Sequence, residues 1–457
     1  MTVIAEEEQA ISHIHGICLK TGPPRRVGVE LEWLVRDARD PALPVTADRI
    51  AGAVAAFGAG TGKGTGTGNG NGAISRLPTS ASPGVLPSGG LLTTEPGGQL
   101  ELSSLPADSV AECVRATATD LVALRAAAAD AGLELAGVGL DPFRPPRRVL
   151  NLPRYAAMEA FFDRDGPWGR QMMCGTASVQ VCLDAGDESD GPDGYRWRWR
   201  LLHTIGPVLV AAFANSPLRD GRRAGWRSAR QQVWARMDPG RTRPPVGPGA
   251  ADGAPVAGRT PGPPDGDPRE AWAAYALDAQ VMCVREPGSE DWSAPPGLTL
   301  REWVRAGSAA PSRPPTTEDL AYHLSTLFPP VRPRGHFELR MIDAQPADGW
   351  VVPTAVVSAL LSDTRAGEAA MAAAARIWDS RPSESNGDGE DPWLRAARLG
   401  PADPRIAAAS RECFAAARAA LVRQATPDAI LAAVDDFIER YVSKDRCPAD
   451  DLLKGLS

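Results

Sequence analysis

Residues 27–34, V-G-V-E-L-E-W-L, alternate between two kinds of side chain and therefore predict a β-strand with two different faces. Because successive side chains of a strand point to opposite sides, Gly28, Glu30, Glu32 and Leu34 share one face. The other face consists of Val27, Val29, Leu31 and Trp33, and we expect it to pack on a core. For an isolated pair of glutamates a solvated sheet face is the favoured explanation, so the pair alone does not indicate a site.

Three later segments repeat this pattern. Residues 95–103, E-P-G-G-Q-L-E-L-S, predict a turn followed by a strand whose polar face carries Gln99, Glu101 and Ser103. Residues 336–342, H-F-E-L-R-M-I, predict a strand with His336, Glu338, Arg340 and Ile342 on one side. Residues 172–184 predict a further strand with neutral hydrogen-bonding groups on one side, namely Thr176, Ser178, Gln180 and Cys182. The simplest interpretation is one shared cavity lined by polar strand faces.

That cavity would contain five carboxylates: Glu30, Glu32, Glu95, Glu101 and Glu338. Like charges in a cleft of low dielectric constant repel one another and raise one another's pKa, so the cluster requires cations. The sequence has no Cys/His cluster with zinc spacing and no H-E-x-x-H motif, so Mg²⁺ or Mn²⁺, which accept oxygen ligands, fits best. Arg340 and Arg236 are candidates to bind a phosphate group, although the segment around Arg236 also fits an ordinary surface helix.

The composition restricts the class of protein. The chain has 457 residues, 43% hydrophobic and 23% charged, which is typical of a folded globular protein. A net charge of -7 does not favour general nucleic-acid binding. The first residues lack the features of a signal peptide and no apolar stretch reaches the length of a membrane span, so we expect a cytoplasmic protein. The seven cysteines form no C-x-x-C motif, which favours reduced thiols.

The remaining pattern predicts the order of the elements. Apolar spacing predicts helices over residues 6–19, 109–131, 155–162, 195–214, 300–306, 316–328, 356–378 and 394–441, and strands over 133–140 and 274–285. Three segments, 58–72, 239–268 and 380–391, predict flexible insertions in a single catalytic domain spanning residues 1–457. The glycine run contains Lys63 but fails the phosphate-loop pattern, because Phe57 occupies the position of the first glycine.

Five motifs together resemble the plant-type glutamate–cysteine ligases of the carboxylate-amine ligase group, and within them the actinobacterial enzymes assigned to ergothioneine biosynthesis. They are G-V-E-L-E (28–32), E-P-G-G-Q-L-E-L-S (95–103), M-C-G-T-A-S-V-Q-V-C-L-D (173–184), A-N-S-P (214–217) and F-E-L-R-M-I-D (337–343). The resemblance implies an α+β fold like that of glutamine synthetase. In such a fold a curved antiparallel sheet forms the active site, helices cover its back, and the C-terminal region is helical.

The resemblance also implies the reaction. ATP phosphorylates the γ-carboxylate of L-glutamate, and the amine of L-cysteine displaces phosphate to give γ-glutamylcysteine and ADP. On the matched positions, Glu30, Glu32, Glu95, Glu101 and Glu338 would bind Mg²⁺ or Mn²⁺. Arg340 and Arg236 would be catalytic, and Thr176 and Gln180 would line the amino-acid pocket. The selectivity for cysteine, the oligomeric state and the division of the carboxylates between metal ions stay open.

Three alternatives remain at this point. A carboxylate-amine ligase with another amine acceptor would share these motifs. A metal-dependent phosphohydrolase could use the same acidic cluster without any amine. A non-catalytic regulator is the least favoured, because every acidic motif is present.

Overall fold

A mixed arrangement of one large β-sheet and many helices builds the protein. The computed structural model describes residues 2–22, 26–58, 83–245, 266–286, 288–307, 313–378 and 391–455. In this part of the chain eight strands form one sheet with the order β2-β3-β4-β1-β6-β10-β9, and β5 pairs with the end of β1. The strands are β1 (Val27–Asp37), β2 (Gly84–Val85), β3 (Leu91–Thr94), β4 (Leu100–Ser103), β5 (Leu133–Ala136), β6 (Ser178–Leu183), β9 (Val331–Pro333) and β10 (Phe337–Asp343). All of these pairings are antiparallel, which confirms the predicted α+β class.

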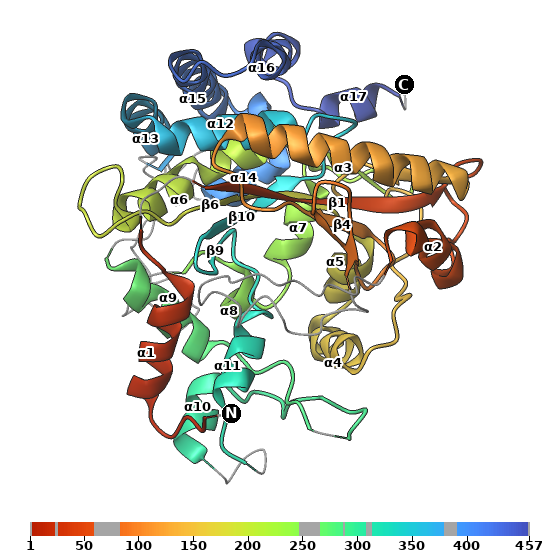
Figure 1. Cartoon of the computed structure of the whole chain (residues 1–457), viewed down its shortest axis with the longest axis vertical. Coiled ribbons are helices and arrows are strands. Elements are labelled where there is room, and N and C mark those ends of the chain that lie inside the picture. The colour runs from red at the N-terminus through yellow and green to blue at the C-terminus, as the bar shows by residue number, and fades with distance from the viewer. Residues whose placement is uncertain are drawn as a thin grey trace, which may run out of the picture.

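The helices lie on both sides of the sheet (Figure 1). On one side lie α3 (Val110–Asp130), α12 (Val351–Ser362), α13 (Thr364–Trp378), α15 (Pro404–Arg423), α16 (Asp428–Arg440) and α17 (Ala449–Lys454). On the other side lie α1 (Glu7–Cys18), α4 (Pro153–Phe162), α5 (Trp168–Gly175), α7 (Ala229–Ala235), α8 (Pro239–Thr242), α9 (Pro268–Asp278), α10 (Leu300–Ala306) and α11 (Thr317–Leu324).

The other described elements are shorter or lie beside these two groups. They are α2 (Ala47–Val54), α6 (Tyr195–Ala212), α14 (Pro392–Leu399), the hairpin β7 (Leu218–Arg219) and β8 (Arg222–Arg223), and the 3₁₀ helices η1 (Ala55–Phe57), η2 (Asp163–Asp165), η3 (Gly400–Ala402) and η4 (Val442–Lys444). Within the described ranges, no helix is both long and apolar enough to cross a lipid bilayer.

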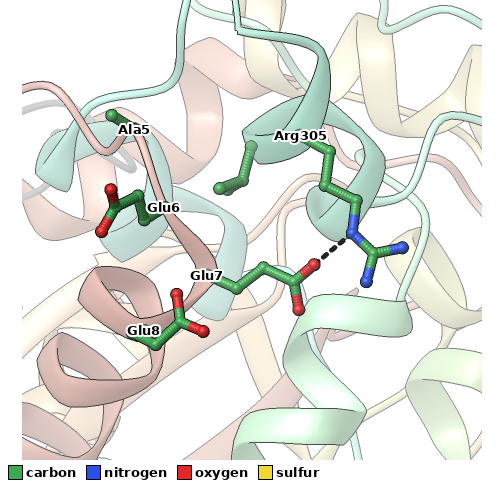
Figure 2. Close-up of a pocket in the computed structure, with 6 residues that line it drawn as sticks. Ala5, Glu6, Glu7, Glu8 and Arg305 are labelled. Atoms are coloured by element: carbon green, nitrogen blue, oxygen red, sulfur yellow. Dashed lines mark hydrogen bonds and ion pairs between the residues drawn. The ribbon is translucent and has the colours of Figure 1, made fainter.

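The N-terminal helix is attached to α10 by ion pairs. Glu7 pairs with Arg301 at 2.5 Å and also with Arg305, whose guanidinium faces it in Figure 2. These contacts fix α1 on the group of helices that includes α9 and α10.

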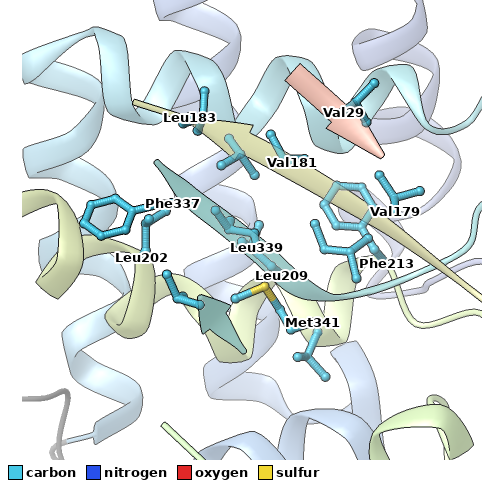
Figure 3. Packing of buried hydrophobic residues seen from close by; sticks show 14 of the residues in the cluster. Val29, Val179, Val181, Leu183, Leu202, Leu209, Phe213, Phe337, Leu339 and Met341 are labelled. Atoms are coloured by element: carbon cyan, nitrogen blue, oxygen red, sulfur yellow. The ribbon is translucent and has the colours of Figure 1, made fainter. Parts of the chain in front are cut away.

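One face of the sheet is apolar and forms the main core. Val29 of β1, Val181 of β6 and Leu339 of β10 pack with Leu202 of α6 and with Phe213, which follows that helix (Figure 3). Residues 29, 31 and 33 of β1 are all buried, as the alternation predicts. Because this face is committed to the core, the alternate residues Glu30 and Glu32 must project from the opposite face.

Several predicted boundaries differ from the structure. The strand predicted from residue 172 begins only at Ser178, because Trp168–Gly175 is helix α5. Residues 274–278 are the end of α9 rather than a strand, since Asp267 caps this helix and Pro268 occupies its first position. Of the predicted insertions, residues 59–72 and 380–390 lie outside the described residues. The third predicted insertion, residues 239–268, begins with helix α8 and ends at the first residue of α9, so it is helical at both ends.

The turn before β4 determines where Glu95 lies. The backbone N–H of Gly98 donates to the carbonyl of Glu95 at 2.8 Å, and Gly98 has a φ of +87° that favours glycine. A side chain on Gly97 would place its Cβ 2.7 Å from the carbonyl carbon of Cys174 at the end of α5. The sequence P-G-G therefore allows this turn to pack directly on the α5 backbone.

We predict that Gly97→Ala lowers stability and turnover together, because either the turn that carries Glu95 or helix α5 must move. The destabilisation should be about 1–3 kcal/mol, typical of overpacking. Gly52→Ala is the matched control, since Gly52 lies inside α2 with nothing within 4 Å of the added methyl group. Removing a helix glycine should stabilise the protein by about 0.5–1 kcal/mol. Urea unfolding measures both, and an equal effect of the two substitutions would contradict the packing described.

Candidate active site on the polar face of the sheet

The strand register places the predicted carboxylates in adjacent rows on one sheet face. Glu32 is directly opposite Glu101 of β4, which is opposite Thr93 of β3. In the next row, Glu30 lies between Ser103 and Gln180. Opposite residues of an antiparallel pair share a face with Cβ atoms about 4.5–5.5 Å apart. Carboxylates that are distant in sequence are therefore close neighbours.

The third row continues toward the edge of the sheet. Cys182 of β6 is opposite both Gly28 and Glu338, and Glu338 is opposite Arg332 of β9. The pairing of β10 with β6 then shifts between Leu339 and Ile342. Such a β-bulge redirects side chains and is frequent beside active sites. Arg340 lies within this bulge.

Glu95 enters the cluster from the turn rather than from a strand. The side-chain amide of Gln99 stabilises this turn, because its Nε2 donates to the carbonyls of Met173 and Thr176 at 3.1 and 3.0 Å. Its Oε1 accepts from the N–H of Gly97 at 3.0 Å. Gln99 thereby connects the turn to the end of α5.

Three of the carboxylates carry raised pKa values. Burial, with the charge of Glu338, raises the pKa of Glu30. Burial and the neighbouring Glu32 raise the pKa of Glu95 to about 7. Burial, together with the nearby carboxylates, also raises the pKa of Glu101 well above its ordinary value, although Thr93 donates a 2.9 Å hydrogen bond to it. Ionising these groups together is unfavourable without a compensating positive charge.

Glu338 has the opposite environment. Its side chain is completely buried, and Arg332 Nη2 lies 2.8 Å and Arg334 Nη1 3.4 Å from its carboxylate oxygens. Arg340 also contacts it. Burial alone would raise the pKa of Glu338, but Arg332 and Arg340 outweigh burial and hold the pKa below its ordinary range. Glu338 therefore gathers three arginines at one side of the carboxylate rows.

Sequence reasoning missed most of these arginines. Arg332 and Arg334 precede Glu338 in V-R-P-R-G-H-F-E, and a hairpin prediction over residues 331–343 would have placed Arg332 opposite Glu338. Arg230 is another omission: it is buried in α7, and its Nη2 donates to the carbonyl of Arg340 at 2.8 Å. No short-range pattern pointed to Arg230, because the pairing spans more than a hundred residues.

The A-N-S-P motif has a structural role. Asp343, at the end of β10, accepts hydrogen bonds from the backbone N–H of Asn215 at 2.9 Å and the hydroxyl of Ser216 at 2.7 Å. The hydroxyl of Ser228, which caps α7, donates to it at 2.9 Å. This buried network fixes the start of α7, and hence Arg230, against β10.

Two predicted residues are not brought into the carboxylate rows. Arg236 follows the last residue of α7 and stacks on Trp168 with 4.5 Å between its Cζ and the ring centroid. Thr176 follows α5, and its hydroxyl donates to the carbonyl of Met172 at 2.6 Å. Its donor is therefore used in ending a helix. Gln180 lies within the site and contacts both Glu32 and Arg340.

A cavity of about 300 Å³ lies elsewhere, beside α1 and α10. Residues 5–8, Val304 and Arg305 line it (Figure 2). It includes none of the predicted site residues, and Glu7 is already paired with two arginines. We therefore place the candidate active site at the sheet face and not at this cavity.

The chemistry of the carboxylate rows suits a hard divalent cation. Among the described residues, no three His, Cys, Asp or Glu side chains stand close enough together to enclose a metal ion as they are arranged. Glu32 and Glu101 are nevertheless directly opposite like charges, and the pKa values of Glu30, Glu95 and Glu101 are raised. Mg²⁺ and Mn²⁺ bind oxygen donors, and a bound ion would reduce the repulsion among these carboxylates. The residues present therefore fit such an ion.

The family model and the bacterial relatives match nearly the whole chain, and a plant relative matches about half of it. Residues 26–455 match the family model described as glutamate-cysteine ligase family 2. The chain is 36% identical over 451 residues to glutamate–cysteine ligase EgtA of Mycobacterium tuberculosis H37Rv, covering 98% of this chain and 90% of that protein. It is 35% identical over 463 residues to EgtA of Mycolicibacterium smegmatis, covering 98% and 95%. The chloroplastic glutamate–cysteine ligase of Medicago truncatula is 30% identical over 260 residues, which cover 56% of this chain and 47% of that protein.

We predict that Glu95→Gln stabilises the metal-free protein at pH 8 and has little effect at pH 4. Because the pKa of Glu95 is raised to about 7 in the folded state, the folded protein binds more protons than the unfolded chain between its ordinary pKa and about 7. Its contribution to stability therefore decreases as pH rises through this window. Because glutamine does not ionise, the substitution should remove that loss and raise the free energy of unfolding at pH 8 by about 1–3 kcal/mol.

Glu338→Gln is the matched comparison and should have the opposite sign. Its pKa is lowered, so its stabilising contribution is present above its ordinary pKa and is lost only in acid. At pH 8 the substitution leaves buried arginines without their carboxylate and should cost about 3 kcal/mol or more. Urea unfolding in EDTA at both pH values measures the two effects. Destabilisation by both substitutions at pH 8 would contradict the assigned repulsion at Glu95.

Proposed function

The chain belongs to glutamate-cysteine ligase family 2, and from this membership we propose that it joins L-glutamate to L-cysteine in a reaction driven by ATP. The products are γ-glutamylcysteine, ADP and phosphate. The observation that carries this proposal is the match to glutamate–cysteine ligases over residues 26–455, which contain every acidic motif of the sheet face. The similarity to the EgtA proteins further supports a role in supplying γ-glutamylcysteine for ergothioneine biosynthesis.

The reaction has two displacements. A γ-carboxylate oxygen of glutamate attacks the terminal phosphorus of ATP, and the bond to ADP breaks. The cysteine nitrogen then attacks the carbonyl carbon of the acyl phosphate, the C–O bond to phosphate breaks, and the amine releases a proton. Both steps bring anionic groups together, so positioned positive charge is the main requirement.

The arginines around Glu338 supply that charge. Arg340 lies in the β-bulge between the carboxylate rows and Phe328, with 5.8 Å between its Cζ and the ring centroid. Its guanidinium is suited to the transferring phosphoryl group because it presents several donors in one plane. Arg332 and Arg334 extend the positive charge along the β9–β10 hairpin. Glu338 orients these side chains, and Arg230 holds the Arg340 backbone.

The carboxylate rows would hold Mg²⁺ or Mn²⁺. Glu30, Glu32, Glu95 and Glu101 are the proposed ligands, with Glu338 as a further candidate that the arginines hold in this arrangement. When bound, such ions neutralise phosphate charge and polarise the phosphoryl group. Without them, the repulsion among these carboxylates opposes the approach of ATP.

We also assign the protein to the cytoplasm. The cysteines of the described residues are all free thiols, and unpaired cysteines are typical of a reducing compartment. The cysteine substrate likewise needs a free amine and a reduced thiol to yield γ-glutamylcysteine.

ADP release by the purified protein with Mg²⁺ and ATP tests this function. We expect release only when glutamate and cysteine are both present, with a product whose mass is their sum less one water. The mixtures to compare are glutamate alone, cysteine alone, both together, and glutamate with 2-aminobutyrate. Phosphate release that is independent of any amine would indicate a phosphohydrolase. Turnover with a different amine but not with cysteine would show that cysteine is not the acceptor.

A further inference from the structure

Gln180 connects two groups that have different roles in the proposed reaction. Its Nε2 donates to Oε1 of Glu32 at 2.7 Å, and its Oε1 accepts from Nη1 of Arg340. The side chain is 1% exposed and lies on β6 in the middle of the sheet. Both ends of this buried amide are therefore used within the protein.

The chemistry of these partners fixes the orientation of the amide. An ionised carboxylate only accepts hydrogen bonds and a guanidinium only donates them. The glutamine side chain has the required length, and its amide offers a donor at Nε2 and an acceptor at Oε1. A glutamate would lose the donor toward Glu32 and add a like charge there, and a methionine would lose both hydrogen bonds.

Residues of α7 hold the backbone around Arg340, whereas Gln180 and Glu338 contact its side chain. In the bulge, Arg230 donates to the carbonyl of Arg340 at 2.8 Å, and Gln231 Nε2 donates to the carbonyl of Met341 at 2.9 Å. These bonds place the start of the side chain. Glu338 and Gln180 then determine where its guanidinium lies.

We propose that Gln180 is a positioning residue that holds the carboxylate of Glu32 and the guanidinium of Arg340 in fixed relation. It thereby aligns a metal-binding group with a phosphate-binding group. This inference rests on the proposed function for the roles of the two partners. It differs from the expectation that Gln180 lines the amino-acid pocket, because Gln180 is buried and each end of its amide holds a protein group.

The first measurement is Mn²⁺ binding to the resting protein, followed by the loss of the free-ion signal in electron paramagnetic resonance. We expect Gln180→Met to weaken Mn²⁺ binding by about tenfold or more, as for other partners that orient metal ligands. Gln345→Met is the matched control. Gln345 is equally buried, and its Nε2 donates to the carbonyls of Phe213 and Asp343 at 2.8 and 2.9 Å. It should leave Mn²⁺ affinity unchanged.

A double-mutant cycle identifies the group through which Gln180 acts. In a Glu32→Gln background, Gln180→Met should have little further effect on Mn²⁺ binding, because the carboxylate that it orients is gone. Additive losses in the double variant would overturn the proposal. Thermal unfolding of each variant confirms that the protein being measured is folded.

Kinetics separates positioning from substrate contact. We expect Gln180→Met to lower kcat by about tenfold or more and to change the KM values for glutamate and cysteine by less than about twofold. A raised KM for either amino acid with unchanged Mn²⁺ affinity and kcat would overturn the proposal and restore the pocket role. If the unsubstituted protein does not release ADP with both amino acids, the proposed function fails, whereas the Mn²⁺ measurements still decide whether Gln180 orients Glu32.

Discussion

Electrostatic repulsion among carboxylates is the constraint on which this site depends. Glu32 and Glu101 stand directly opposite one another, and Glu30 and Glu95 adjoin them. An ordinary sheet would avoid this arrangement, because like charges on opposed strands are destabilising. The large apolar core on the other face can support that cost (Figure 3). Packing on the apolar face of the sheet thus offsets the unfavourable charge pattern on the polar face, as is common at functional sites.

The structure keeps positive charge next to this negative charge without cancelling it. Three arginines surround Glu338 at one edge of the carboxylate rows, namely Arg332, Arg334 and Arg340. Gln180 is the neutral link between the arginines and the carboxylates. In the proposed reaction, the carboxylate rows would hold the cations and the arginines would contact the phosphoryl group, so the two regions would act on it separately. The β-bulge at Arg340 and the buried Asp343 network hold this division in place.

Alternation is a local property, and it correctly predicted the buried face of residues 27–33. In the strand predicted over residues 336–342 the expected face of Ile342 was wrong, because the β-bulge after Leu339 puts Ile342 opposite Val179 in the apolar core. The sequence could not show that Glu338 is opposite Arg332, since that depends on hairpin register. The strand predicted from residue 172 was too long, because a short apolar run reads equally as helix or strand and Met172 belongs to α5. The contacts of the α7 arginines also depend on the fold: Arg236, just after α7, stacks on Trp168, whereas Arg230, six residues earlier within α7, reaches β10.

The most direct test of this account is a crystal structure of the protein with Mn²⁺, in which anomalous scattering locates the ion. The account predicts Mn²⁺ on the polar sheet face, bound by carboxylate oxygens from at least two of Glu30, Glu32, Glu95 and Glu101. Mn²⁺ bound elsewhere, or a sheet face that stays without the ion at concentrations that saturate turnover, would contradict the claim that metal binding is what this cluster of carboxylates is for.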